Sequence, residues 1–480
     1  MANTIIEQKP RHTTLPVEQD IIFTVSNDAI VATELKVKFI AEVYISSELP
    51  TNITPTAVPV GTFKTTANNA GVGMFDFRAI VESYVKADNM AANGSAYKLA
   101  TTTDSTTHPL HLIDQYSTNS NSFRYLNIRF SVEYLGADAT YPNTVSVAAG
   151  TEKDSSTYHI FNGYLKHSNI LDLQGVNFGY NLGAFNLNDD DKSFLTNAPA
   201  TQYANIEDYG TVGILMLKPV FNDLTPLLVG NGFAMIRFDY YNENGVLLDW
   251  ETIRLDDITT GGFTHANRFE AKNMLNFAGV YPANLRGWST KFNSNIDDIS
   301  YYTFVAQTLV GLVATDISQN YRININCPTL KGFEPIRLTW LNQWGAWDYY
   351  TFNMKSIRKI STKGSTYNQL GGTWNEAAYR LDSFKGGKKS FRVNATEKIT
   401  VNTDFVSESE GEWFEELINS PEVYILQGFQ TDSTASALNQ YVTPVRLTTS
   451  SYTRKTVAND RLMQYTFEVE KSKTLRTQSV

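Results

Sequence analysis

Two long segments that alternate apolar and polar residues place the strongest constraint on the fold. From Leu35 to Ile45, apolar side chains occupy every second position, with Lys36, Lys38 and Glu42 between them. Residues 126–134 alternate in the same way. A period of two places alternate side chains on opposite faces of a β-strand. Both segments are therefore predicted to be strands with one buried face.

The composition also favours a mainly β protein. Aromatic residues make up 12% of the 480 residues, and charged residues only 19%. Disordered chains are highly charged and poor in aromatic residues, and coiled coils need Ala, Glu, Lys and Leu in quantity. Neither class fits. Aromatic and β-branched residues suit a pleated, half-buried sheet, so we expect β-sandwich-like domains.

Four parts are expected along the chain. Residues 1–19 are predicted to form a polar N-terminal arm, because prolines interrupt them and nothing alternates. Two β-sandwich-like domains are expected over residues 20–170 and 171–330. Residues 331–480 are predicted to form a C-terminal α+β or β-rich domain.

Turn and capping signals predict three local elements. Asn244-Gly245 lies between two apolar segments and supplies the two positive-φ positions of a type I′ hairpin turn. A second hairpin is expected over residues 335–354. Ser407, followed three residues later by Glu410, forms a capping box, so a short acidic helix is predicted over residues 408–418.

Charge is segregated in the C-terminal third. Residues 355–392 contain nine basic and two acidic residues, a net charge of +7. Residues 404–422 contain seven acidic residues and no basic one, a net charge of −7. Opposite charges on neighbouring segments favour contact between copies of the chain or docking to another subunit. Solvated faces are an alternative. A nucleic-acid site is another, although a net charge of −9 disfavours a dedicated phosphate binder.

The predicted protein interface combines these charges with tryptophans, which are frequent at binding hot spots. Core packing is the competing interpretation for the tryptophans, and we favour it for Trp340 and Trp413. The candidate interface residues are Trp344, Trp347, Lys385, Lys388, Lys389, Glu412, Glu415 and Glu416.

No sequence signature of catalysis is present. The chain has no phosphate-binding loop, no H-E-x-x-H and no G-x-S-x-G. His108 and His111 lie in a stretch interpreted as an exposed loop, over residues 86–121. Asp189-Asp190-Asp191 is interpreted as a solvated turn. Cys327, the only cysteine, is predicted to be a core residue, so no intrachain disulfide can form. We expect no enzymatic activity, metal, cofactor or membrane span.

Several phrases resemble virion proteins of tailed phages that infect Bacteroidota, including the crAss-like phages. The resemblance is carried by short segments between about residues 20 and 470. Its main phrase is F-E-P-I-R-L-T-W-L-N-Q-W-G-A-W-D, residues 333–348, in which Trp344 and Ala346 make the turn bulkier than the usual glycine pair. The other phrases include residues 74–84, 160–163, 193–199, 420–424, 451–456 and 464–467.

This resemblance implies a structural component of the virion tail, assembled in the bacterial cytoplasm. Such a hub or baseplate-like adaptor forms a ring with itself and binds other tail proteins or fibres. It implies no cofactor and no catalytic residue, and nucleic acid is expected only as the passing genome. Two alternatives stay open. One is a tail-associated glycan-degrading enzyme, which needs two carboxylates converging in a cleft. The other is a receptor- or carbohydrate-binding module, which needs a row of exposed aromatic residues.

Overall fold

The computed structural model confirms the mainly β prediction: 50% of the described residues lie in strands and 13% in helical elements. Among the described residues, no helix has the length and apolar character needed to cross a membrane. The structure describes residues 3–47, 58–87, 89–90, 109–113, 115–118, 121–135, 145–166, 182–185, 187, 190–215, 233–254, 274–310, 313–326, 332–372, 377–380, 383–427, 441–449, 451–453, 463–473 and 475–476.

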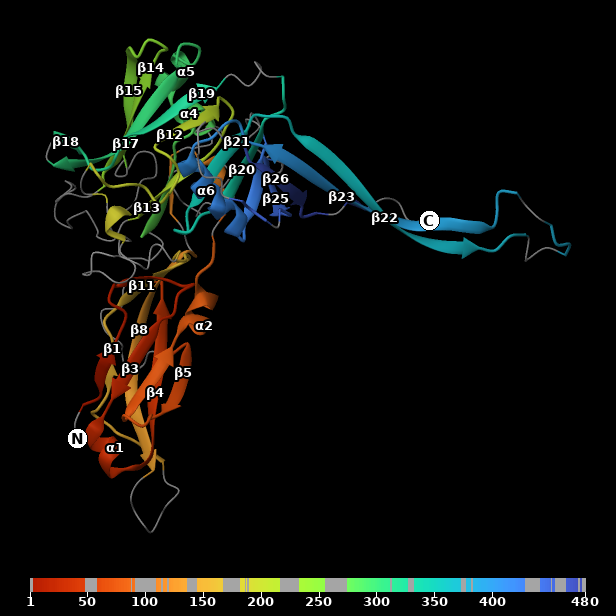
Figure 1. Cartoon of the computed structure of the whole chain (residues 1–480). Coiled ribbons are helices and arrows are strands. Elements are labelled where there is room, and N and C mark those ends of the chain that lie inside the picture. Colours follow the sequence, from red (N-terminus) through yellow and green to blue (C-terminus); the bar gives the residue numbers. More distant parts are fainter. Residues whose placement is uncertain are drawn as a thin grey trace. The chain divides into compact units, whose positions relative to one another are not determined.

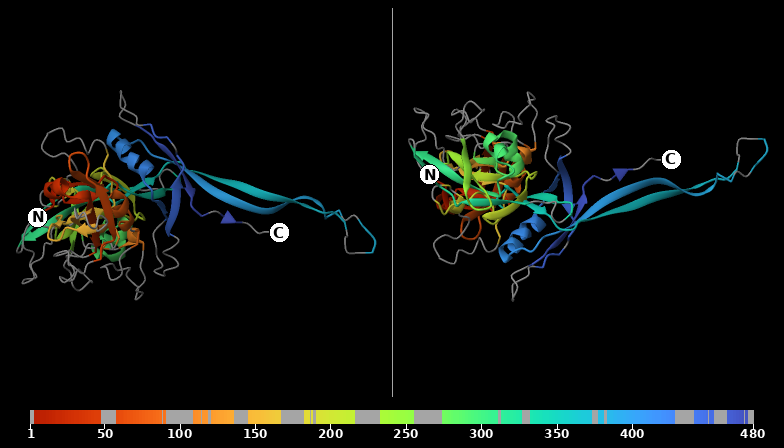
Figure 2. Two further views of the ribbon diagram at one scale, coloured as in Figure 1. Left: turned by 90° about the horizontal axis from the view of Figure 1, so that it is seen from below. Right: turned by 90° about the horizontal axis from the view of Figure 1, so that it is seen from above.

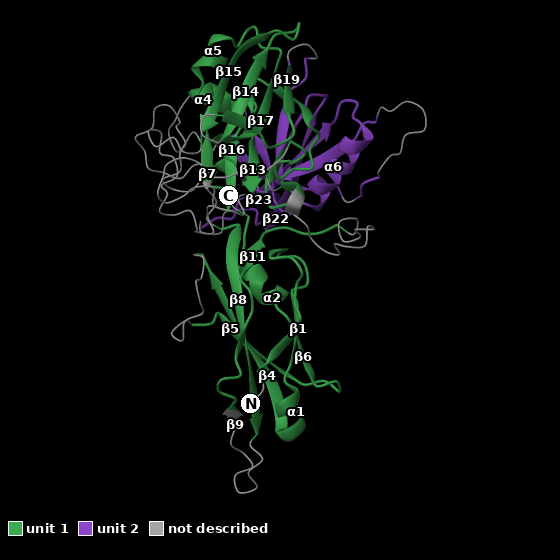
Figure 3. Ribbon diagram, turned by 90° about the vertical axis from the view of Figure 1, so that its left-hand side faces the viewer, with its two compact units in different colours: residues 1–325, 341–348, 431–435 green, residues 326–340, 349–430, 436–480 purple. Residues whose placement is uncertain are grey.

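The chain divides into two compact units, shown in different colours in Figure 3. Unit 1 comprises residues 1–325, 341–348 and 431–435, and unit 2 comprises residues 326–340, 349–430 and 436–480. The start of unit 2 lies close to the predicted boundary at residue 330. The turn over residues 341–348, however, belongs to unit 1.

The first part of unit 1 is a β-sandwich, as the alternating segments predict. Its smaller sheet has the order β1-β3-β6: Ile5–Gln8, Ile22–Ser26 and Val72–Asp76. The larger sheet has the order β2-β11-β8-β4-β5: Thr14–Pro16, Tyr158–Phe161, Phe123–Leu135, Leu35–Ser46 and Gly61–Thr66. Two short strands, β9 (Val145–Val147) and β10 (Lys153–Asp154), also pair with β8. The helical elements of this part are α1 (Asp28–Thr33), α2 (Arg78–Val81), η1 (Glu82–Tyr84) and η2 (Leu110–Leu112).

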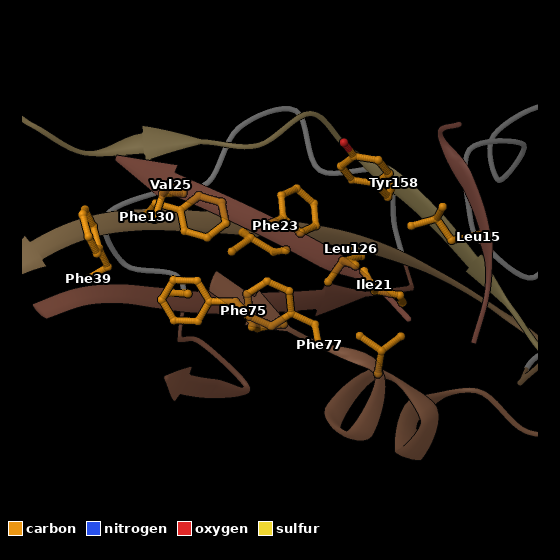
Figure 4. Packing of buried hydrophobic residues seen from close by; sticks show 14 of the residues in the cluster. Leu15, Ile21, Phe23, Val25, Phe39, Phe75, Phe77, Leu126, Phe130 and Tyr158 are labelled. Atoms are coloured by element: carbon orange, nitrogen blue, oxygen red, sulfur yellow. The ribbon is translucent and has the colours of Figure 1, made fainter. Parts of the chain in front are cut away.

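The core of this sandwich is rich in phenylalanine. Phe23 packs against Phe77 and Phe130 with ring centroids 5.7 and 5.6 Å apart (Figure 4). Phe39, Ala41 and Val43 are fully buried, so the alternation of β4 does mark its inner face.

The predicted N-terminal arm is wrong. β1 pairs with β3, and β2 pairs in parallel with β11. Leu15 and Val17 are buried in the sandwich core. These strands are four and three residues long, too short for a period of two to stand out in the sequence.

The second part of unit 1 is built from two further sheets. One has the order β12-β19-β17-β14-β15: Thr201–Asn205, Tyr321–Asn326, Tyr301–Val310, Met235–Tyr241 and Leu247–Arg254, with β18 (Val313–Asp316) beside β17. The other has the order β13-β16-β7: Thr211–Leu215, Leu275–Gly279 and Tyr116–Thr118. Because β7 precedes residue 170 and pairs with β16, the sheets do not divide at the predicted boundary. The helical elements among its described residues are η3 (Leu182–Phe185), α4 (Pro282–Trp288) and α5 (Thr290–Ser294).

The hairpin of β14 and β15 is confirmed, but its predicted turn type is wrong. Gly245 has a φ of 75°, whereas Asn244 is not among the described residues with positive φ. The Gly245 amide donates to the Asn242 carbonyl, and the Asn242 side chain accepts from the amides of Asn244 and Val246. The turn is therefore built on an Asn-x-x-Gly pattern that starts two residues earlier, and only its glycine takes the left-handed conformation.

Unit 2 is one eight-stranded sheet with a helix packed on it. The sheet order is β21-β20-β24-β25-β26-β23-β22: Trp347–Phe352, Ile336–Leu341, Val423–Leu426, Val442–Leu447, Thr466–Lys471, Gly387–Asn402 and Ile357–Gln369, with β27 (Leu475–Arg476) beside β23. The helix, α6 (Glu408–Asn419), begins at the predicted Ser407 capping box. Its residues Trp413 and Phe414 pack against Trp340 and Phe467, with ring centroids 4.9 and 5.5 Å apart. Core roles for Trp340 and Trp413 are therefore confirmed.

Other predictions concern positions outside the described residues or at their edges. His108, Asp189 and Cys327 lie outside the described residues. Within the stretch predicted to be an exposed loop, residues 109–113 are instead buried. His111 is among them and is fully buried, so this stretch is not one continuous solvated loop.

Candidate interaction surface

The two longest strands of unit 2, β22 and β23, are neighbours and form a ribbon. They pair from Ile357 opposite Thr400 to Gln369 opposite Gly387. β26 pairs with β23 only at residues 398–402, and β27 only at residues 394–395. Beyond these positions the ribbon runs on as two strands that stay side by side (Figures 1 and 2). All β22 side chains from residue 357 to 366 are exposed.

The antiparallel register gathers basic side chains on one face of the ribbon. Lys359 lies opposite Lys398, Ser365 opposite Arg392, and Tyr367 opposite Lys389. Because alternate residues share a face, Lys363 joins the same set. Phe391 lies at a register shift, and its ring is 6.4 Å from that of Tyr367. We call this set the cationic face: Lys359, Lys363, Lys389 and Arg392, with Tyr367 and Phe391.

The base of the ribbon is neutralised by ion pairs, whereas its outer part is not. Lys398 pairs with Glu468 at 2.8 Å, and Lys471 pairs with Glu397 at 2.8 Å. Farther out, the structure pairs none of Lys363, Lys388, Lys389 and Arg392 with a carboxylate of a described residue. The outer part therefore presents positive charge to any neighbouring surface.

Apolar side chains are also exposed along this ribbon and near its tip. Ile360 is 63% exposed and Phe391 is 49% exposed. Leu370 and Phe384, near the tip, are each 72% exposed. An isolated two-stranded hairpin is only marginally stable in water, and β22 leaves one backbone edge of the sheet open. Such an element gains stability when a partner covers it.

The sequence predicted the charge of this segment but not its shape. Lys388 is exposed, whereas Lys385 and Lys389 are partly buried. Lys389 Nζ donates to the Phe384 carbonyl at 3.2 Å. The ribbon itself was missed because β22 is exposed from residue 357 to 366 and shows no apolar period. The β-branched residues between the glycine pairs at 371–372 and 386–387 and the sheet were the available signal.

Helix α6 carries the acidic half of the predicted interface. Glu408, Glu412 and Glu415 are spaced i, i+4 and i+7, which places them on one side of the helix. We call them the acidic stripe. Glu412 is exposed and Glu415 is partly buried. Glu416 is only 1% exposed, so including it in a surface contact was wrong: it lies on the buried side of the helix with Trp413 and Leu417.

The two tryptophans proposed as contact residues are interior residues of unit 1. Trp344 is 7% exposed and packs against Phe185, with ring centroids 4.6 Å apart. Trp347 is 2% exposed and lies edge-on to His111 at 4.8 Å. Their placement in a surface contact is therefore corrected. A turn in sequence is usually exposed, but this one is covered by segments more than 150 residues earlier.

Three phrases of the phage resemblance meet around that turn. Asn342 Nδ2 donates to the Leu195 carbonyl at 2.9 Å and to Asp348 Oδ1 at 3.1 Å. Thr196 Oγ1 donates to the same Asp348 oxygen at 2.6 Å. The Tyr164 amide donates to the Gln343 carbonyl at 3.1 Å. Residues 193–199 and Tyr164, which directly follows the phrase at residues 160–163, therefore hold residues 341–348 within unit 1.

The acidic side chains of the described residues form no group of three or more with His or Cys that could hold a metal. Burial raises the pKa of the Glu251 carboxyl. It accepts hydrogen bonds from the hydroxyls of Tyr240 and Ser289. These bonds join β14, β15 and the junction between α4 and α5, which is a structural role.

Exposed Trp250 of β15 and partly buried Tyr301 of β17 bear on the carbohydrate-binding alternative. Trp250 is 48% exposed, and Arg237 and Lys291 lie 4.9 and 5.3 Å from its ring centroid. Arg322 lies 3.6 Å from the ring centroid of Tyr301. These cations occupy ring faces on which a sugar would stack, so this surface favours cation–π contacts within the chain.

Neither the protein-family models nor the curated proteins include a match to this chain.

Proposed function

We propose that this chain is a non-enzymatic structural protein of a phage tail. In this proposal it is a hub-type adaptor that forms a ring with further copies of itself and binds other tail proteins or fibres. The resemblance of several phrases to virion proteins of Bacteroidota phages supports the tail assignment. Copies would be made in the bacterial cytoplasm and function in the virion.

The observation that carries the assembly role is the ribbon. It extends a well-packed sheet, its strand β22 is exposed from residue 357 to 366, and it combines positive charge with exposed apolar side chains. Such a surface suits contact with another protein, since desolvating Ile360 and Phe391 contributes free energy and the lysines select an acidic partner. The β-sandwich and the sheet of unit 2 would act as rigid supports.

Shortening the ribbon tests the assembly role. Lys363 and Asn394 are register partners, so residues 364–393 can be replaced by an Asn-Gly turn without disturbing the pairing nearer the sheet. We expect the shortened full-length chain to keep its thermal unfolding midpoint within about 2 °C, because most described residues of the removed part are exposed or only partly buried. We expect its sedimentation to remain monomeric at concentrations where the unaltered chain associates. Equal association of both chains would refute the role of the ribbon.

The tail assignment has a separate test. Antibodies against the purified chain should label the tail of purified particles, seen by immunoelectron microscopy. Label confined to the capsid, or absent from particles that contain all other virion proteins, would refute that assignment.

A further inference from the structure

The cationic face of the ribbon and helix α6 lie on opposite sides of the sheet in unit 2. Val401 of β23 lies opposite Phe467 of β26, and the Phe467 ring contacts Phe414 of α6. Residues of β23 that share a face with Val401 therefore point to the helix side. Lys398 points to the other side, and the register places Lys359 beside it.

The acidic stripe therefore cannot reach the cationic face of its own chain. At the base of the ribbon the sheet separates the two. Farther out, the ribbon runs away from the sheet on which α6 packs (Figures 1 and 2). Each copy thus presents a positive surface and a negative surface in different directions.

The two surfaces also match in length. Lys363 and the Tyr367–Lys389 pair are four residues apart along the ribbon, which is about 13 Å at the usual rise of a strand. Glu408 and Glu415 are seven residues apart on α6, which is about 10 Å at the usual rise of a helix. Neighbouring long side chains can close a difference of about 3 Å, since lysine and arginine have flexible stems.

We propose that the cationic face of the ribbon binds the acidic stripe of α6 in a second copy of the chain. This inference rests on the proposed self-assembly and names the surfaces that it uses. The contact is head-to-tail, because the two surfaces differ. Head-to-tail contacts close into rings when the rotation between copies divides a full turn. The exposed Phe391 and Tyr367 would cover apolar surface at the same contact.

An acidic protein surface is favoured over a nucleic acid for two reasons. The chain itself contains a segment of charge −7 that complements the +7 segment, and its overall charge of −9 opposes approach to a polyanion. Nucleic-acid binding is therefore an outcome of the test and not the proposal.

A charge-exchange experiment on the full chain tests the pairing. The first variant is Lys363→Glu with Arg392→Glu, the second is Glu412→Lys with Glu415→Lys, and the third combines all four changes. The control, Lys9→Glu with Lys38→Glu, makes the same net charge change as the first variant at two exposed lysines of the first sandwich. Self-association is measured by sedimentation velocity at low and high salt, and retention of a short mixed-sequence DNA duplex is measured in parallel. Circular dichroism melting checks the fold of each variant.

We expect each of the first two variants to weaken self-association at least about tenfold, and the combined variant to recover most of that loss. The control should associate as the unaltered chain does. High salt should weaken association of the unaltered chain, because it screens exposed charges.

The contrary outcomes distinguish failure of self-assembly from failure of the ribbon–helix pairing. An unaltered chain that stays monomeric at every concentration overturns self-assembly itself. Association that is unchanged in the first two variants overturns only the ribbon–helix pairing. Association lost in both but not recovered in the combined variant also overturns the pairing. DNA retention that is lost in the first variant, with association unchanged, assigns the cationic face to nucleic acid instead.

Discussion

Three turns of the same sequence pattern provide a controlled test of how the turn over residues 342–345 is held. Gly71, Gly245 and Gly345 each end an Asn-x-x-Gly turn, with φ values of 78°, 75° and 76°. A Cβ atom at Gly71 would lie 3.5 Å from Val31, and one at Gly245 would lie 3.5 Å from the Tyr301 hydroxyl. At Gly345 it would lie 2.1 Å from the Asn162 carbonyl oxygen. Replacement by alanine therefore imposes the same backbone strain three times but a collision only once.

The structure gives the expected size of each effect. A non-glycine residue in the left-handed region costs about 1–2 kcal/mol, so Gly71→Ala and Gly245→Ala should each lower the free energy of unfolding by about that much. At Gly345 the turn must also withdraw, which breaks the bonds from Tyr164 to Gln343 and from Asn342 to Leu195. At about 0.5–1.5 kcal/mol for each bond, plus displaced packing, the total is about 3–5 kcal/mol.

Thermal unfolding followed by circular dichroism measures the difference. Unit 1 has about 340 residues, and an unfolding entropy of about 2.1 cal/mol/K for each residue gives a shift of about 1.4 °C for 1 kcal/mol. Gly345→Ala should lower the midpoint by about 4–7 °C, and the two other variants by about 1–3 °C. Three equal shifts would show that Gly345 does not lie against Asn162, and the packing inferred for this turn would be wrong.

Three other changes have expected outcomes. Trp344→Ala should cost about 3–5 kcal/mol in urea unfolding because its side chain is buried, whereas exposed Trp250→Ala should cost about 1 kcal/mol; equal losses would contradict the assigned burial. The raised pKa of Glu251 means that its protonated form stabilises the fold below about pH 4.5 and that this stability is lost as pH rises through the raised pKa. Glu251→Gln can still accept from Ser289 but carries no charge. The melting midpoint of this variant minus that of the unaltered chain should therefore be larger at neutral pH than at pH 4.5; an equal difference at both pH values would refute this. Ser407→Ala removes the capping box of α6 and should cost about 1 kcal/mol, measured as a lower melting midpoint; an unchanged midpoint would show that the cap contributes nothing.

Burial at the predicted contact residues illustrates where sequence reasoning fails. From the sequence, a tryptophan at a turn and a glutamate on a charged helix are both expected to lie on the surface. Trp344 is nevertheless covered by Phe185, which lies about 160 residues earlier in the chain. Glu416 lies on the buried side of α6. Such contacts depend on long-range packing, which no local pattern records.

The sequence by itself determined the elements whose signals are local. Alternation specified β4 and β8 and their inner faces, because a period of two corresponds to one buried side of a strand. The capping box located the start of α6 to the residue. The opposite net charges of residues 355–392 and 404–422 also followed from the sequence alone. Each of these depends only on neighbouring residues.

The tertiary structure decided which segments pair and which surfaces remain open. β1 pairs with β3, and β2 takes its strand partner from β11, far along the chain. The basic segment becomes a ribbon with a cationic face only because its register with β23 aligns lysines from one strand with an arginine from the other. Register and burial arise from the balance of many distant contacts, whereas charge and periodicity are properties of the chain before it folds.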